Sequence, residues 1–123
     1  DMKSLTPLLH VRDLVESLDF YQILGFELEQ QMPEEGAPNW AYIVQGPVHL
    51  MLQEVSDSQA EARLTRDSEQ DLVLHIGHGD LLGFHALLSE QDVPVSDMQT
   101  EGLPEFMIRD PDGYALVFFL DEA

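Results

Sequence analysis

Cysteine is absent from this chain of 123 residues, which excludes a disulfide framework, a thiolate zinc site and a cysteine nucleophile. Long apolar runs are also missing, and one of the longest, residues 114–120, is far too short to cross a bilayer. No basic segment leads into a long apolar stretch at the start of the sequence, so no signal peptide is predicted. The expectation is a cytoplasmic protein without a transmembrane helix.

Positive charge is scarce. Lysine and arginine together number 5 against 24 aspartates and glutamates, which gives a formal net charge of −19. Such a surface repels phosphate backbones and anionic lipids, which argues against nucleic-acid and membrane partners. Two interpretations of the acidity stay open: it provides solubility in a saline or crowded setting, or it creates a field that attracts a cationic ligand.

The first half of the chain carries start and stop signals for one helix. Asp13 with Glu16 three residues later forms a capping-box pattern, and Gly25 suits the position just after a helix. The spacing therefore predicts a helix over Asp13–Leu24. Alternating apolar residues predict strands before and after this helix, at Leu5–Val11, Phe26–Gln31, Asn39–Gln45 and Val48–Gln53.

The second half follows a polar, acidic segment, Glu54–Gln70, which is interpreted as a linker with one helical turn around Ala60. Asp80 is predicted to cap a second helix. Pro111 and Gly113 indicate a tight turn between the last two strands. The strands expected in this half are Asp71–His78, Val95–Thr100, Glu105–Arg109 and Tyr114–Leu120.

The order of elements in the first half is repeated in the second. The segment Leu8–Val11 recurs as Val73–Ile76, and Leu50–Leu52 corresponds to Leu116–Phe118. The predicted fold class is α+β, with two tandem βαβββ modules in a single domain. The modules are expected at about residues 4–54 and 71–121, joined by an acidic linker at about 55–70.

Motifs near both ends of the chain carry a family resemblance. They are Val11–Leu14, Ser17–Tyr21, Leu24–Phe26 and Glu105–Tyr114. Over nearly its whole length the chain resembles the glyoxalase / bleomycin resistance / extradiol dioxygenase superfamily, also called vicinal oxygen chelate. The resemblance implies that each module curls its sheet into a half-barrel, that a ligand cleft lies on the concave face, and that the protein forms a homodimer.

Enzymes of this superfamily hold a divalent metal with His, Glu or Gln side chains from the first and fourth strands of each module. The resemblance places these four positions at Thr6, Met51, Asp71 and Val117. A hydroxyl, a thioether and an isopropyl group cannot hold such an ion, and one carboxylate does not make a site. The expectation is therefore no metal and no cofactor, and the chain is interpreted as closest to the metal-free, bleomycin-resistance-type branch.

The predicted function is the binding of a small molecule, with sequestration of an antibiotic or another cationic aromatic compound as the specific form. Aromatic and methionine side chains suit a flat apolar ligand, and carboxylates would meet its charge. The expected ligand-binding residues are Trp40, Tyr42, Met51, Asp71, Glu105, Met107, Val117 and Phe119. The competing interpretation is that these side chains simply fill the half-barrels.

Three alternatives stay open. One is a zinc site of three histidines, because strand alternation puts His10, His49 and His75 on the cleft side. The second is a metal-dependent lyase or dioxygenase with an atypical site. The third is a cofactor-independent, isomerase-like enzyme in which Asp71, Glu105 or His10 acts as the base.

Overall fold

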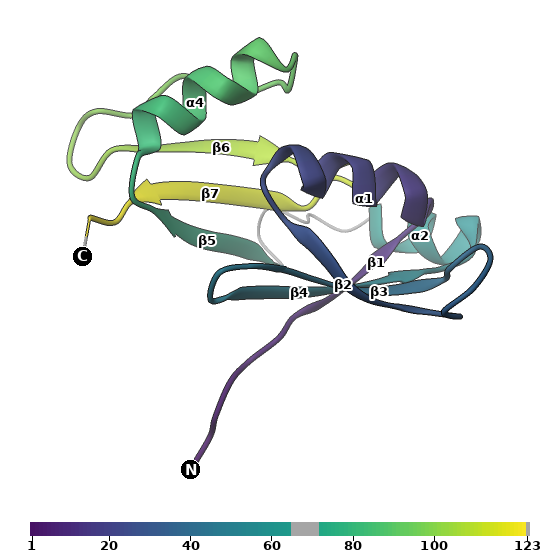
Figure 1. Ribbon diagram of the computed structural model, residues 1–123. Coiled ribbons are helices and arrows are strands. Elements are labelled where there is room, and N and C mark those ends of the chain that lie inside the picture. Colours follow the sequence, from purple (N-terminus) through teal and green to yellow (C-terminus); the bar gives the residue numbers. More distant parts are fainter. Residues whose placement is uncertain (65–71, 123) are drawn as a thin grey trace. The chain divides into compact units, whose positions relative to one another are not determined.

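The computed structural model describes residues 1–64 and 72–122, and the chain divides into two units, Asp1–Arg63 and Leu64–Ala123 (Figure 1). Each unit places a helix on one face of a small sheet. The elements of the first unit are β1 Leu8–Val11, α1 Leu14–Ile23, β2 Glu27–Met32, β3 Trp40–Gln45, β4 Val48–Glu54 and α2 Asp57–Leu64. Those of the second are β5 Val73–His78, α4 Leu81–Glu90, β6 Glu105–Arg109 and β7 Ala115–Leu120.

The sheet of the first unit has the strand order β1-β4-β3-β2. The β1 strand runs parallel to β4, whereas β3 pairs antiparallel with both of its neighbours. Side chains alternate across β1, so Leu9 and Val11 are buried while Leu8 and His10 are exposed. The core of this unit is built from Leu9, Val11, Leu14, Ser17, Tyr21, Leu24, Phe26, Ala41, Ile43, Leu50 and Leu52.

The helix of the first unit begins and ends where the sequence predicts. The Asp13 carboxylate accepts a hydrogen bond from the Glu16 N–H (3.2 Å) and so satisfies one of the free N–H groups at the helix start. Gly25 follows the C-cap residue Leu24 with φ of 104°, a left-handed conformation that glycine adopts without steric cost. The chain then turns directly into β2.

The sheet of the second unit has the order β5-β7-β6, with β5 parallel to β7 and β6 antiparallel to it. The predicted cap is present here too, because the Asp80 carboxylate accepts from the Gly83 N–H (3.1 Å). The α4 helix covers one face of the sheet with Leu81, Phe84 and Leu88 (Figure 1). The other buried apolar residues of this unit are Val93, Phe106, Ile108, Tyr114, Ala115, Leu116 and Phe118.

The predicted strand Val95–Thr100 is wrong. This segment contains a single bridge, Gln99 to Glu105, and otherwise runs irregularly along the edge of β6. The Ser96 N–H donates to the Met107 carbonyl (3.0 Å), and the Gln99 N–H donates to the Glu105 carbonyl (2.7 Å). Between these two hydrogen bonds the segment advances three residues while β6 advances two, so the segment has one residue more than β6. The Met107 N–H donates to the Ser96 hydroxyl (2.8 Å) instead of to a backbone carbonyl. A regular ladder cannot continue through such a register change.

Two other boundaries differ from expectation. The β1 strand begins at Leu8 rather than Leu5, because Pro7 has no N–H for the ladder and contributes only its carbonyl, which accepts from the Met51 N–H (2.9 Å). The segment interpreted as a linker contains α2, which is longer than the single turn expected. Its remainder, residues 65–70, lies outside the described residues.

Two open sheets of four and three strands, each with a helix on one face, confirm the predicted α+β class. Within residues 1–64 and 72–122, no helix has both the length and the apolar character needed to cross a bilayer.

Candidate ligand-binding faces

Each sheet has one face covered by its helix and a second face, here called the helix-free face. In the first unit, alternation along β3 and β4 buries Ala41 and Leu52 and turns Trp40, Tyr42 and Met51 to the helix-free face, where all three are half-buried. Tyr42 lies opposite Met51 in the strand pairing. This face therefore brings together three of the predicted binding residues.

Tyr42 is held in place by its neighbours on this face. Its ring centroid lies 6.4 Å from that of Trp40 and 5.6 Å from that of His49, which it meets edge to face. The Tyr42 hydroxyl is hydrogen-bonded to Nδ1 of His49. One nitrogen of His49 is thus engaged within the protein, and the two larger aromatic rings form a fixed surface.

The helix-free face in the second unit has three cross-strand rows, one of which is Arg109, Ala115 and Val73, and the predicted binding residues lie in the other two. One row runs from Met107 through Val117 to His75, and the other from Glu105 through Phe119 to Gly77. The four predicted binding residues in these rows, Glu105, Met107, Val117 and Phe119, are half-buried. Asp71, the remaining predicted residue, lies outside the described residues.

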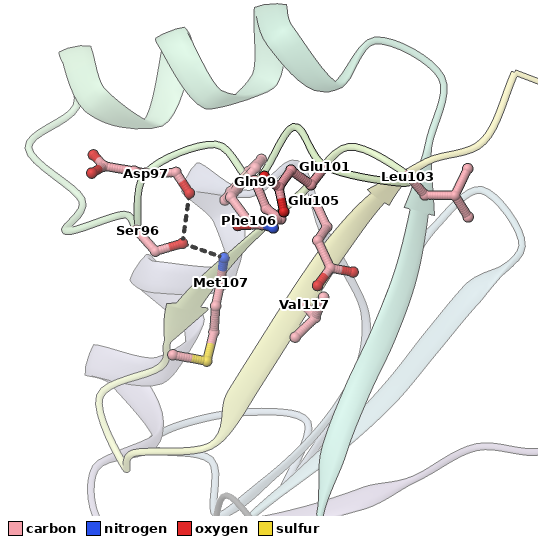
Figure 2. A pocket seen from close by; sticks show the side chains of 9 residues that line it. All are labelled: Ser96, Asp97, Gln99, Glu101, Leu103, Glu105, Phe106, Met107 and Val117. Carbon is pink, nitrogen blue, oxygen red and sulfur yellow. Dashed lines mark hydrogen bonds between the residues drawn. The ribbon is translucent and has the colours of Figure 1, made fainter.

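A pocket of about 630 Å³ opens above this second face (Figure 2). Three of the predicted residues, Glu105, Met107 and Val117, line it together with Phe106. Figure 2 shows the Glu105 side chain extending into the pocket over β7. The remaining lining residues are Ser96, Asp97, Gln99, Glu101 and Leu103.

The sequence did not indicate these five residues or Phe106 as part of a site, and three of them, Ser96, Asp97 and Gln99, fall in the segment predicted as a regular strand. A strand would have turned every second side chain away, whereas the irregular course of residues 96–103 wraps around the pocket (Figure 2). The one available signal was chemical: Asp97, Glu101 and Gly102 are residues typical of loops.

The β5 strand is shifted relative to the repeat seen in the sequence. Leu8 lies opposite Met51 in the first sheet, and His75 lies opposite Val117 in the second. If Met51 and Val117 are equivalent, as the repeat has them, the residue equivalent to Leu8 is His75 rather than Val73. The two halves therefore match in strand order, with a shift of two residues in β5.

This shift affects the positions that hold metal in superfamily enzymes. By this pairing, the position that the resemblance assigns to Asp71 would instead be Val73. Thr6, Val73, Met51 and Val117 together offer one hydroxyl and one thioether, which does not fit a divalent ion. Among residues 1–64 and 72–122, no group of three or more His, Cys, Asp or Glu side chains is placed to hold a metal.

A family model described as the Glyoxalase/Bleomycin resistance protein/Dioxygenase superfamily matches residues 5–118. The chain belongs to this superfamily, and its α+β architecture is the glyoxalase/bleomycin resistance fold. A search of curated proteins finds no match.

Solved structures with the same fold include both binding proteins and an enzyme. A bleomycin-binding protein complexed with bleomycin is 19% identical, with a TM-score of 0.74 over 98% of this chain and 100% of that chain. A bleomycin resistance determinant encoded on transposon Tn5 is 19% identical, with a TM-score of 0.75 over 99% and 100%. A lactoylglutathione lyase from Agrobacterium tumefaciens is 15% identical, with a TM-score of 0.68 over 98% and 96%. At these identities the likeness shows the fold alone.

Proposed function

We propose that the protein binds a flat, cationic small molecule on its helix-free faces and leaves it chemically unchanged, as an antibiotic-sequestering protein does. The observation that carries this proposal is the character of the positions where superfamily enzymes hold metal. The resemblance places Met51 and Val117 there, and both are half-buried among aromatic and methionine side chains. Side chains of this kind stabilise a ligand by burial and stacking, and neither Met51 nor Val117 offers a hard ligand to a divalent ion.

The pocket of the second unit supports the same function by its size and its charge. Its volume of about 630 Å³ falls within the range of small-molecule sites. Asp97, Glu101 and Glu105 line it, and the net charge of −19 adds a negative field around the whole protein. This field would raise the rate at which a cation associates. The two similar bleomycin-associated proteins point to the same class of ligand.

The test is calorimetric titration and stopped-flow binding with bleomycin and a panel of flat cationic aromatic compounds. We expect stoichiometric binding of at least one compound, with an association rate that falls about 10-fold or more between about 20 mM and 500 mM salt. The salt effect is expected because screening removes the attraction between the carboxylates and the cation. An association rate that does not change with salt concentration would contradict the proposal that the negative field attracts the ligand.

The alternative function is a metal-dependent lyase, because a lactoylglutathione lyase has a similar structure. Mass spectrometry of the recovered ligand and elemental analysis of protein purified without chelators separate the two functions. A binding protein returns the ligand unchanged and carries less than stoichiometric metal. Turnover of the ligand that disappears with the metal on chelation would establish the enzyme instead.

We further propose that the two modules, about residues 4–54 and 71–121, form one domain that acts as a homodimer in the cytoplasm. The aromatic residues on the helix-free faces are only half-buried within one chain, and a second copy would complete the enclosure of a ligand. Light scattering on the eluting protein is expected to give about twice the chain mass of 13.9 kDa. A monomeric mass at a concentration where the ligand binds would contradict the dimer.

A further inference from the structure

Phe119 stands apart from the other phenylalanines of the chain. Each of the other five has an aromatic ring close to its own, as in the core group Phe84, Phe106 and Phe118. Phe119 lies on the helix-free face of β7, half-buried, and has no ring neighbour among the described residues. A ring without an aromatic neighbour on this face of the sheet is a candidate for stacking with a ligand.

The Phe119 ring can lean over the neighbouring strand β5 because the residue opposite it is a glycine. Gly77 is the β5 residue opposite Phe119 in the strand pairing. A Cβ atom placed on Gly77 would come within 3.2 Å of Cζ, the tip of the Phe119 ring, and within 2.8 Å of Cβ of Asp121. The ring tip therefore reaches across to β5 and covers the place where any other residue would have a side chain. Phe119 leans over the sheet rather than standing up from it.

Glu105 lies on β6, the neighbour of β7 on the side away from Gly77. It is the β6 residue opposite Phe119, so the two Cβ atoms are expected about 4.5–5.5 Å apart. Its half-buried carboxylate has no hydrogen bond or ion pair with any described residue. A half-buried carboxylate and an aromatic ring on paired residues of neighbouring strands are two groups that can each attract a cation.

We propose that Gly77, Phe119 and Glu105 form the subsite for the positively charged, flat part of the ligand, with Gly77 as the residue that determines its shape. This inference rests on the proposed binding function and specifies the chemical class of the group that is bound. In this subsite a flat heteroaromatic cation stacks on Phe119 while its charge lies near Glu105, which also lines the pocket of the second unit together with Val117. A side chain at position 77 would lift the ring and close the space for a flat group.

The experiment is an amide NMR titration with two probes of the same shape and different charge, 1-methylquinolinium and 1-methylnaphthalene. We expect the cation to bind about 5–30-fold more tightly than the neutral compound. The largest shift changes are expected at the amides of Gly77, Glu105 and Phe119. In the Glu105→Gln variant the preference should fall to within about 2-fold. Glu90→Gln, which removes an exposed carboxylate on α4, should leave it intact.

Two further variants test the geometry. Gly77→Ala is expected to weaken binding of the cation at least about 5-fold, because the added Cβ displaces Asp121 and the ring tip. Gly79→Ala is the matched control, since its Cβ would meet only the Asp121 carbonyl, at an ordinary 3.8 Å. Phe119→Leu, which keeps apolar volume without a ring, should abolish the preference for the cation even if Gly77→Ala fails to fold.

The outcomes separate this inference from the proposed function. If both probes bind with shift changes on the helix-free faces but with equal affinity, or if Gly77→Ala binds the cation as Gly79→Ala does, the subsite is wrong and the binding function stands. If neither probe nor any compound of the calorimetric panel binds, the binding function is wrong and the subsite falls with it.

Discussion

Replacing Phe118 with alanine is expected to lower the free energy of unfolding by about 3–5 kcal/mol, whereas the same change at its neighbour Phe119 is expected to lower it by about 1 kcal/mol. Phe118 is 3% exposed, and its ring centroid lies 4.9 Å from that of Phe84 and 5.6 Å from that of Phe106. Its removal leaves a cavity under α4 that the close-packed rings cannot fill. Phe119 points to the other face of the same strand and is only half-buried.

Urea denaturation followed by circular dichroism measures both effects. Because a domain of this size is stable by only about 5–15 kcal/mol, Phe118→Leu provides a milder variant, with an expected loss of about 1–2 kcal/mol. Because the same substitution is made at two adjacent residues, the two variants differ only in the face of β7 from which the ring is removed. Equal losses at the two positions would contradict the assignment of one to the core and the other to the binding face.

Replacing Asp110 with alanine is expected to lower the free energy of unfolding by about 2–4 kcal/mol. This carboxylate is 4% exposed and organises the turn between β6 and β7. Its Oδ1 atom accepts hydrogen bonds from the N–H groups of Asp112 (3.0 Å) and Tyr114 (2.9 Å). Alanine would leave both buried donors without this acceptor, and an unsatisfied buried donor costs most of its desolvation energy.

The matched variant is Asp110→Asn, which keeps an oxygen acceptor at the same place and removes the charge. We expect it to cost about 1 kcal/mol, because the two hydrogen bonds persist in a weaker, uncharged form. Thermal and urea unfolding of the three proteins should therefore rank the wild type first, asparagine second and alanine last. If asparagine is as destabilising as alanine, the charge of Asp110 matters more than its role as an acceptor.

Much of the local structure could be predicted from the sequence because the signals involved are local. The capping aspartates Asp13 and Asp80 begin their helices as expected, since a short acceptor side chain needs only the next turn of its own helix. Gly25 ends α1 for an equally local reason, its positive φ. Alternating apolar residues indicated most of the strands for the same reason, since alternation is a property of the segment itself.

The predictions failed where a residue far away in the sequence decides the outcome. Residues 95–100 are predicted as a strand, yet the Ser96 hydroxyl accepts from the Met107 N–H and the segment has one residue more than β6 before Gln99. Nothing in that segment alone reveals its register against β6. The two-residue shift of β5 is of the same kind, because parallel pairing with β7 places it.

The sequence by itself determined the family, the α+β class, the acidic charge and the lack of metal donors at Met51 and Val117, since these follow from residue identity and order. Only the tertiary structure decided that residues of the 96–103 loop line a pocket and that the tip of the Phe119 ring lies beside Gly77. The physical reason is that both features depend on the register of strands distant in the chain. Register is set by packing and hydrogen bonding across the whole sheet rather than by any one segment.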